Sequence, residues 1–126
     1  MKKKYKLLII DDEEENLSVL SNFFRKKNYS VVTASNGLEG MKLFEAENAN
    51  FDLIITDLVM PHITGVGIIS IVKKTHPEMP VIAITGWGEH PEALAIESQA
   101  DLVLKKPFKL PELENFISNL LSKKRT

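Results

Sequence analysis

Five short apolar runs, separated by stretches with helical periodicity, constrain the fold of this chain more than any other feature. The runs occupy residues 5–10, 30–34, 52–56, 80–84 and 101–104. Apolar runs of about four to eight residues are typical of strands buried on both faces of a parallel sheet. Each gap is long enough for the crossover helix that a parallel connection requires. The alternation therefore predicts an α/β fold, a five-stranded doubly wound parallel sheet with flanking helices.

Each gap between the runs carries apolar residues at the spacing of a helix. We therefore expect helices over about residues 14–28, after Asn36-Gly37, over about residues 65–75 and from near Leu110 onward. Asn28 can adopt the left-handed conformation that often ends a helix. The side chains expected to face the sheet are Leu17, Leu20, Phe24, Leu38, Met41, Phe44, Ile68, Ile69, Val72, Leu113, Phe116, Ile117, Leu120 and Leu121.

Length and composition narrow the class of protein. A chain of 126 residues predicts one domain, residues 1–126, with a real hydrophobic core. Its 16 basic and 17 acidic residues give a net charge of -1, so charge offers no general case for binding nucleic acid or a membrane. There is no cysteine, and the apolar run that follows the basic start is too short for a secretory signal. We expect a cytoplasmic protein whose basic ends are solvated tails.

Polar and charged residues follow four of the predicted strands. Asp11 and Asp12 follow the first run, and Asp57 follows the third. Thr85 follows the fourth run, and Lys106 lies just after the fifth. Because the carboxyl ends of parallel strands meet at one edge of a sheet, we expect these side chains to lie together. Crowded carboxylates repel one another, which implies a cation, and oxygen ligands without His or Cys suit Mg²⁺ or Mn²⁺.

These residue types also match the requirements of carboxylate phosphorylation. An aspartate can attack phosphorus, while a divalent cation offsets the charge that develops on the equatorial oxygens. Lys106 can pair with a phosphoryl oxygen, and the Thr85 hydroxyl can donate to another. Gly86 lets backbone amides approach the group closely.

The order of these motifs resembles the receiver domain of bacterial two-component response regulators, a flavodoxin-like fold, over nearly the whole chain. The matching elements are Asp11-Asp12, Asp57-Leu58-Val59-Met60-Pro61 with Gly65, Thr85-Gly86, and Lys106-Pro107-Phe108. The resemblance implies that Asp57 accepts a phosphoryl group from the phosphohistidine of a sensor histidine kinase or a histidine phosphotransfer protein.

The resemblance also implies a role for each matching residue. Asp12, Asp57 and the Val59 carbonyl would bind Mg²⁺ directly, whereas Asp11 would act mainly through water. Thr85 and Lys106 would contact the phosphoryl group, together with the backbone at Val59 and Gly86. The Lys106-Pro107 bond resembles one that is cis in the family.

Three positions depart from the family pattern or lack a settled role. Receivers usually carry Tyr or Phe three residues before the lysine, a ring that moves with the threonine on activation. Val103 stands at that position, so this aromatic readout is in doubt. Gln99 replaces the glycine that normally ends the preceding helix, which we therefore expect to be short or irregular. Trp87, two residues after Thr85, either covers apolar surface or shields the phosphoryl group from water. The downstream partner cannot be inherited from the family.

Three kinds of function remain open on the sequence. The chain is a signalling domain that switches partner binding, or it is the N-terminal receiver of a longer regulator with a DNA-binding or enzymatic output domain. The third is an aspartate-nucleophile phosphohydrolase of the haloacid dehalogenase type, which needs an acid two residues after its nucleophile. Val59 occupies that position, which argues against turnover of external substrates. No basic helix or zinc spacing supports direct nucleic-acid binding.

Overall fold

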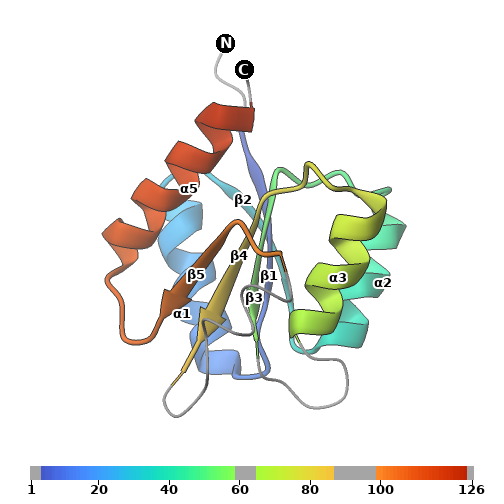
Figure 1. Cartoon of the computed structure of the whole chain (residues 1–126). Helices are drawn as coiled ribbons and strands as arrows, with labels where there is room; N and C mark the ends of the chain where they lie inside the picture. Colours follow the sequence, from blue (N-terminus) through green and yellow to red (C-terminus); the bar gives the residue numbers. More distant parts are fainter. Residues whose placement is uncertain (1–3, 59–64, 87–98, 125–126) are drawn as a thin grey trace.

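The fold is given by a computed structural model that describes residues 4–58, 65–86 and 99–124. These residues form one parallel five-stranded sheet in the order β2-β1-β3-β4-β5 (Figure 1). The strands are β1 (Lys6–Ile10), β2 (Ser30–Ala34), β3 (Leu53–Asp57), β4 (Val81–Thr85) and β5 (Leu102–Lys105). The structure therefore confirms the doubly wound sheet that the apolar runs predict.

Helices of the described part of the chain lie on both faces of the sheet (Figure 1). Helices α1 (Glu14–Lys26) and α5 (Leu110–Lys124) lie on one face, and α2 (Gly37–Ala46) and α3 (Gly65–Thr75) lie on the other. The irregular helix expected before Gln99 falls on residues 87–98, which lie outside the described residues. Among the helices of the described part of the chain, none has the length and apolarity needed to cross a membrane.

The hydrophobic core consists of two layers that share the sheet. Successive residues of β1 point to opposite faces, so Leu7 and Ile9 pack with α1 and α5. Leu8 and Ile10 pack on the other face with Phe44 of α2 and with the buried α3 side chains Ile68, Ile69 and Val72. Burial of each such side chain contributes about 1.5 to 3 kcal/mol. Because Leu7 to Ile10 are buried on both faces of the sheet, a polar residue among them would be costly, and after Lys6 the next polar residue is Asp11, where the strand ends.

Strand and helix boundaries differ slightly from the sequence prediction. Strands β3, β4 and β5 each lie one residue further toward the carboxyl end, because backbone pairing continues after the apolar run stops. Helix α1 ends at Lys26, and Asn28 adopts a φ of 71°, which confirms its left-handed conformation. Gln99 also adopts a left-handed φ of 64°, a region that glycine occupies without steric cost.

One predicted core residue is wrong. Leu38 is 53% exposed, because α2 packs on the sheet through Gly37, Gly40 and Phe44. A Cβ atom at Gly40 would lie only 2.5 Å from Ile10 Cδ1, so glycine lets the helix approach β1 closely. The buried stripe of α2 therefore contains glycines that a search for apolar side chains does not find. Met41 is partly buried, and Phe44 is buried as predicted.

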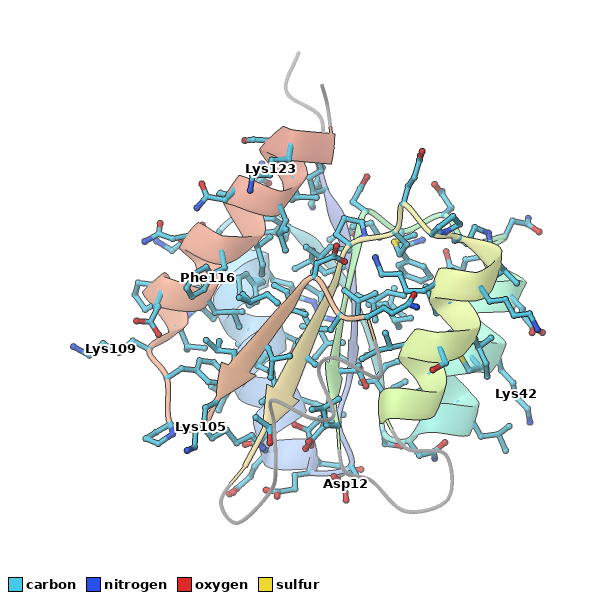
Figure 2. The ribbon with its side chains drawn as sticks, viewed as in Figure 1. Asp12, Lys42, Lys105, Lys109, Phe116 and Lys123 are labelled. Atoms are coloured by element: carbon cyan, nitrogen blue, oxygen red, sulfur yellow. The ribbon has the colours of Figure 1, made fainter. Side chains whose placement is uncertain are left out.

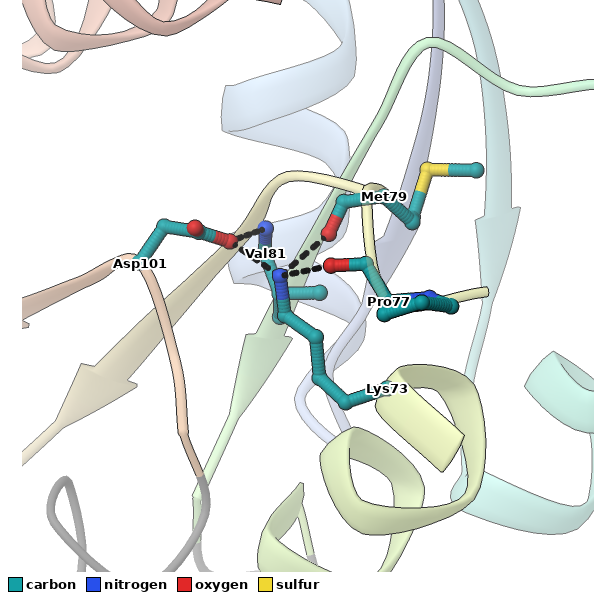
Figure 3. Close-up of polar contacts among 5 residues, drawn as sticks. All are labelled: Lys73, Pro77, Met79, Val81 and Asp101. Atoms are coloured by element: carbon teal, nitrogen blue, oxygen red, sulfur yellow. Dashed lines mark hydrogen bonds and ion pairs between the residues drawn. The ribbon is translucent and has the colours of Figure 1, made fainter. Parts of the chain in front are cut away.

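A polar network joins the elements at the amino-terminal edge of the sheet. Lys73, near the end of α3, donates hydrogen bonds from Nζ to Asp101 Oδ2 at 2.7 Å and to the Met79 carbonyl at 2.7 Å (Figure 3). The same nitrogen lies 3.4 Å from the Pro77 carbonyl. Asp101 Oδ2 also accepts a 2.7 Å hydrogen bond from the Val81 N–H. Asp101 therefore links α3, the start of β4 and the segment that leads into β5.

Candidate functional site

The opposite, carboxyl-terminal edge of the sheet collects those predicted site residues that the structure describes. Backbone hydrogen bonds extend the ladder past the strands: the Asp11 N–H donates to the Ala34 carbonyl at 3.1 Å. The Lys106 N–H donates to the Thr85 carbonyl at 2.8 Å. Asp11 and Lys106, the first residues after β1 and β5, are therefore each held by a hydrogen bond to the neighbouring strand. Figure 2 shows Asp12 at this end of the molecule, at the end of the sheet where β5 also ends.

Three carboxylates meet at this edge. Asp11, Asp12 and Asp57 each offer an oxygen, and these oxygens lie within 4.8 Å of one another. Asp11 is 2% exposed and Asp57 is 7% exposed, whereas Asp12 is exposed to solvent. At 4.8 Å and an effective dielectric constant of about 20, two negative charges repel by about 3 kcal/mol. A set of close oxygen donors in this arrangement suits a hard divalent cation such as Mg²⁺.

Local hydrogen bonds fix the orientation of Asp11. Its Oδ1 accepts a 2.9 Å hydrogen bond from the Glu13 N–H, and its Oδ2 accepts one from Asn16 Nδ2 at 3.3 Å. Burial raises the pKa of Asp11 above its usual value of 3.8. The Glu13 and Asn16 hydrogen bonds and the charge of Lys106 lower this pKa in part, while the charge of Asp12 adds to the increase.

Sequence reasoning missed Asn16. The residue lies five positions after Asp11, in the first turn of α1, where the helix turns its side chain back toward the end of β1. The sequence feature that could have indicated this role is the uncharged amide of Asn16, which directly follows the three acidic residues Glu13 to Glu15. That signal is weak, because asparagine is common near the start of helices.

Lys106 is the basic residue of the site. Its Nζ lies 3.6 Å from Asp57 Oδ2, which is within the range of an ion pair. The Lys106-Pro107 peptide bond is cis, as the resemblance implied. Lys106 therefore partly offsets the charge of Asp57 before any ligand binds.

Thr85 is the last residue of β4 and Gly86 follows it, beside the end of β3. Thr85 is fully buried, and its neighbour Ile84 pairs with Asp57 in the sheet. The contact of the Thr85 hydroxyl with a phosphoryl group remains a prediction. The Val59 carbonyl and Trp87, with its two interpretations, lie outside the described residues.

A hollow of about 310 Å³ opens beside the site, between α1 and the segment that follows β5. Asp11, Asn16 and Lys106 form its polar end. Val19 and Phe108 belong to its apolar part, and Val19 is 55% exposed. Val103 does not line this hollow, because it packs on the face of the sheet that α2 and α3 cover.

Comparisons with known proteins agree on one class. The family model described as the response regulator receiver domain matches residues 7–118. Response regulator SaeR of Staphylococcus aureus is 32% identical over 118 residues, which are 93% of this chain and 50% of that protein. A receiver domain protein from Clostridium thermocellum is 34% identical, with a TM-score of 0.89 over 96% of this chain and 97% of that chain. Response regulator TrrA from Thermotoga maritima, solved in complex with Mg²⁺ and BeF, is 27% identical, with a TM-score of 0.82 over 92% of this chain and 98% of that chain.

The fold and the acidic site thus define a signalling domain rather than a classical enzyme. The chain belongs to the response regulator receiver domain family. Mg²⁺ binding at an acidic cluster and phosphorylation are typical of this family, and its members interact with histidine kinases and downstream effectors. The chain spans about half the length of the curated relatives that it matches.

Proposed function

We propose that Asp57 accepts a phosphoryl group from the phosphohistidine of a sensor histidine kinase or a histidine phosphotransfer protein. The observation that most directly supports this role is the position of Asp57 between Lys106, at 3.6 Å, and the carboxylates of Asp11 and Asp12, within 4.8 Å. The family match makes phosphorylation the expected chemistry of such a site. Asp57 is the only one of these carboxylates within the ion-pair range of Lys106 among the described residues.

The cation site would consist of oxygen donors from this chain. Asp12, Asp57 and the Val59 carbonyl would bind Mg²⁺ directly, and Asp11 would act mainly through water. The donors of the described residues fit this ion, because three carboxylate oxygens converge within 4.8 Å without nitrogen or sulfur ligands. Mn²⁺ has similar ligand preferences and would bind the same donors. When bound, the cation offsets the negative charge of the transferring group.

During transfer, an Asp57 oxygen forms a bond to phosphorus while the bond between phosphorus and the histidine nitrogen breaks. The electron pair of the broken bond stays with the imidazole. The Lys106 ammonium and the Thr85 hydroxyl would hold two of the phosphoryl oxygens, and backbone N–H groups at Val59 and Gly86 would contact the remainder. Self-phosphorylation from a donor and autodephosphorylation are the only reactions that we assign to the domain.

We further propose that residues 1–126 act as a single receiver unit that works in the cytoplasm and changes its protein contacts when phosphorylated. In a longer regulator, the contacted partner would be an attached output domain with DNA-binding or enzymatic activity. In a separate receiver, the partner would be another protein. The relatives that are about twice the length of this chain support the first arrangement.

Intact-mass spectrometry tests the acceptor. Acetyl phosphate with Mg²⁺ should add one phosphoryl group to the wild-type protein and none to Asp57→Asn. Asp52→Asn, directly before the other end of β3, is the matched control and should be labelled like wild type. Equal labelling of Asp57→Asn would move the acceptor to another residue.

Asp12→Ala should also weaken Mg²⁺ binding, because one direct ligand is lost.

A further inference from the structure

Asn16 lies between two carboxylates at the start of α1. Its Nδ2 is 3.3 Å from Asp11 Oδ2 and 3.4 Å from Glu13 Oε2. An asparagine amide carries two hydrogens on this nitrogen, so one can be donated to each carboxylate. Asn16 therefore joins a residue of the cation site to the helix that follows it.

The contact is not an ordinary helix cap. Asn16 occupies the third helical position of α1, from which a side chain in a capping box would accept the N–H of the residue at the cap. Here the cap residue is Glu13, and its N–H already donates to Asp11 Oδ1 at 2.9 Å. Asp11 takes the role of that acceptor, and Asn16 instead donates to Asp11.

Two donors on different oxygens restrict the carboxylate of Asp11. Rotation about the bond between its Cβ and Cγ would break both the Glu13 and the Asn16 hydrogen bonds. Each carboxylate oxygen has two lone pairs, so one on each remains available on the side away from these donors. With Asp11 only 2% exposed, bulk water has little access with which to replace a lost donor.

We propose that Asn16 is a positioning residue of the cation site, which acts by holding the Asp11 carboxylate in the orientation that a divalent cation or its bound water requires. This inference rests on the proposed function, because it requires the cation to bind at Asp11, Asp12 and Asp57. Residues that orient metal ligands from outside the ligand set commonly change metal affinity by about 10- to 100-fold. Asn16 also lines the hollow beside the site, together with Asp11 and Lys106.

Calorimetric titration of the metal-free protein with Mg²⁺ tests this role. Asn16→Ala should bind Mg²⁺ about tenfold more weakly than wild type. Asn22→Ala is the matched control, because Asn22 is an exposed asparagine in the same helix, and it should bind like wild type. Asn16→Leu keeps the approximate volume without the donor, so it should show the same loss if the alanine variant folds poorly.

A double-mutant cycle separates positioning from a general structural effect. In the Asp11→Asn background, Asn16→Ala should cause no further loss of Mg²⁺ affinity, because the carboxylate on which it acts is gone. A full additional loss there would overturn the inference, as would wild-type affinity in both Asn16 variants. Failure of wild type itself to bind Mg²⁺ would instead refute the proposed cation site.

Discussion

Charged side chains are paired at one edge of the sheet and crowded with like charges at the other. At the amino-terminal edge, Lys73 donates to Asp101 and to the Met79 carbonyl, and Lys6 pairs with Glu47. At the carboxyl-terminal edge, three carboxylates lie within 4.8 Å of one another, and the lysine of the site is 3.6 Å from its nearest carboxylate oxygen. The first edge is arranged for stability. The second retains repulsion that a cation would relieve, which indicates that the site is organised for its ligands at some expense of stability.

The largest expected effect comes from breaking the amino-terminal network. Lys73→Met should lower the free energy of unfolding by about 2 kcal/mol, because Asp101 and two carbonyls lose their shared donor. The side chain of Lys73 is only 9% exposed, so water replaces it poorly. Urea denaturation followed by circular dichroism measures the change. Lys74→Met, at the exposed neighbouring position, is the control and should change stability by less than about 0.5 kcal/mol.

Removal of a carboxylate at the carboxyl-terminal edge should change stability in the opposite direction. In EDTA, Asp12→Ala or Asp57→Asn should raise the free energy of unfolding by about 1 kcal/mol, because each removes one of the mutually repelling charges. Lys106→Ala should lower it, since the positive charge near Asp57 is lost. Differential scanning calorimetry shows both shifts. A lower thermal midpoint for Asp12→Ala would mean that the hydrogen bonds of that carboxylate outweigh the repulsion.

Backbone strain next to the amino-terminal network should give a smaller effect. Gln99 has a φ of 64°, and Asp101 is anchored two residues later. Gln99→Gly should therefore raise the free energy of unfolding by roughly 0.5 to 1 kcal/mol, because glycine adopts this region without a steric penalty. Urea denaturation gives the value. Gln99→Ala keeps the strain and should bring no such gain, so equal stabilisation by alanine would refute this explanation.

The smallest effect concerns the pH dependence of the carboxyl-terminal edge. Burial raises the pKa of Asp11 above 3.8, so between 3.8 and its value in the folded state the folded protein binds more protons than the unfolded chain. The contribution of Asp11 to the free energy of unfolding is fully present below pH 3.8 and is lost as the pH rises through the folded-state pKa. In EDTA, the stability difference between Asp11→Asn and wild type should therefore increase across this window. A difference that does not change with pH would contradict the raised pKa.

Much of the fold could be predicted because its strongest signals are local. Strands buried on both faces give continuous apolar runs, and the parallel topology then brings Asp11, Asp57, Thr85 and Lys106 to one edge. The same reasoning placed the charged residues of the site without any knowledge of side-chain geometry. The family resemblance added the roles of individual residues.

The errors and omissions share a physical cause: they depend on contacts that no periodic pattern records. Leu38 was expected inside because it is apolar, whereas α2 packs through Gly40. Lys73, in the last turn of a helix, has the sequence signature of a solvated residue, and its partner Asp101 is 28 residues away. Asn16 acts on Asp11 through a single amide.

We expect substitutions at Gly40, in α2, to disturb the acidic site through Ile10. Ile10 is the residue that a Cβ atom at Gly40 would strike, and it directly precedes the two aspartates that follow β1. Ile10 is almost completely buried, so it has little room in which to move aside. A genetic screen for loss of signalling would therefore recover substitutions at Gly40 that mimic lesions of the aspartates. Such alleles should be rescued by a smaller residue at position 10, such as Ile10→Val or Ile10→Ala, whereas true losses of Asp11 or Asp12 should not be rescued.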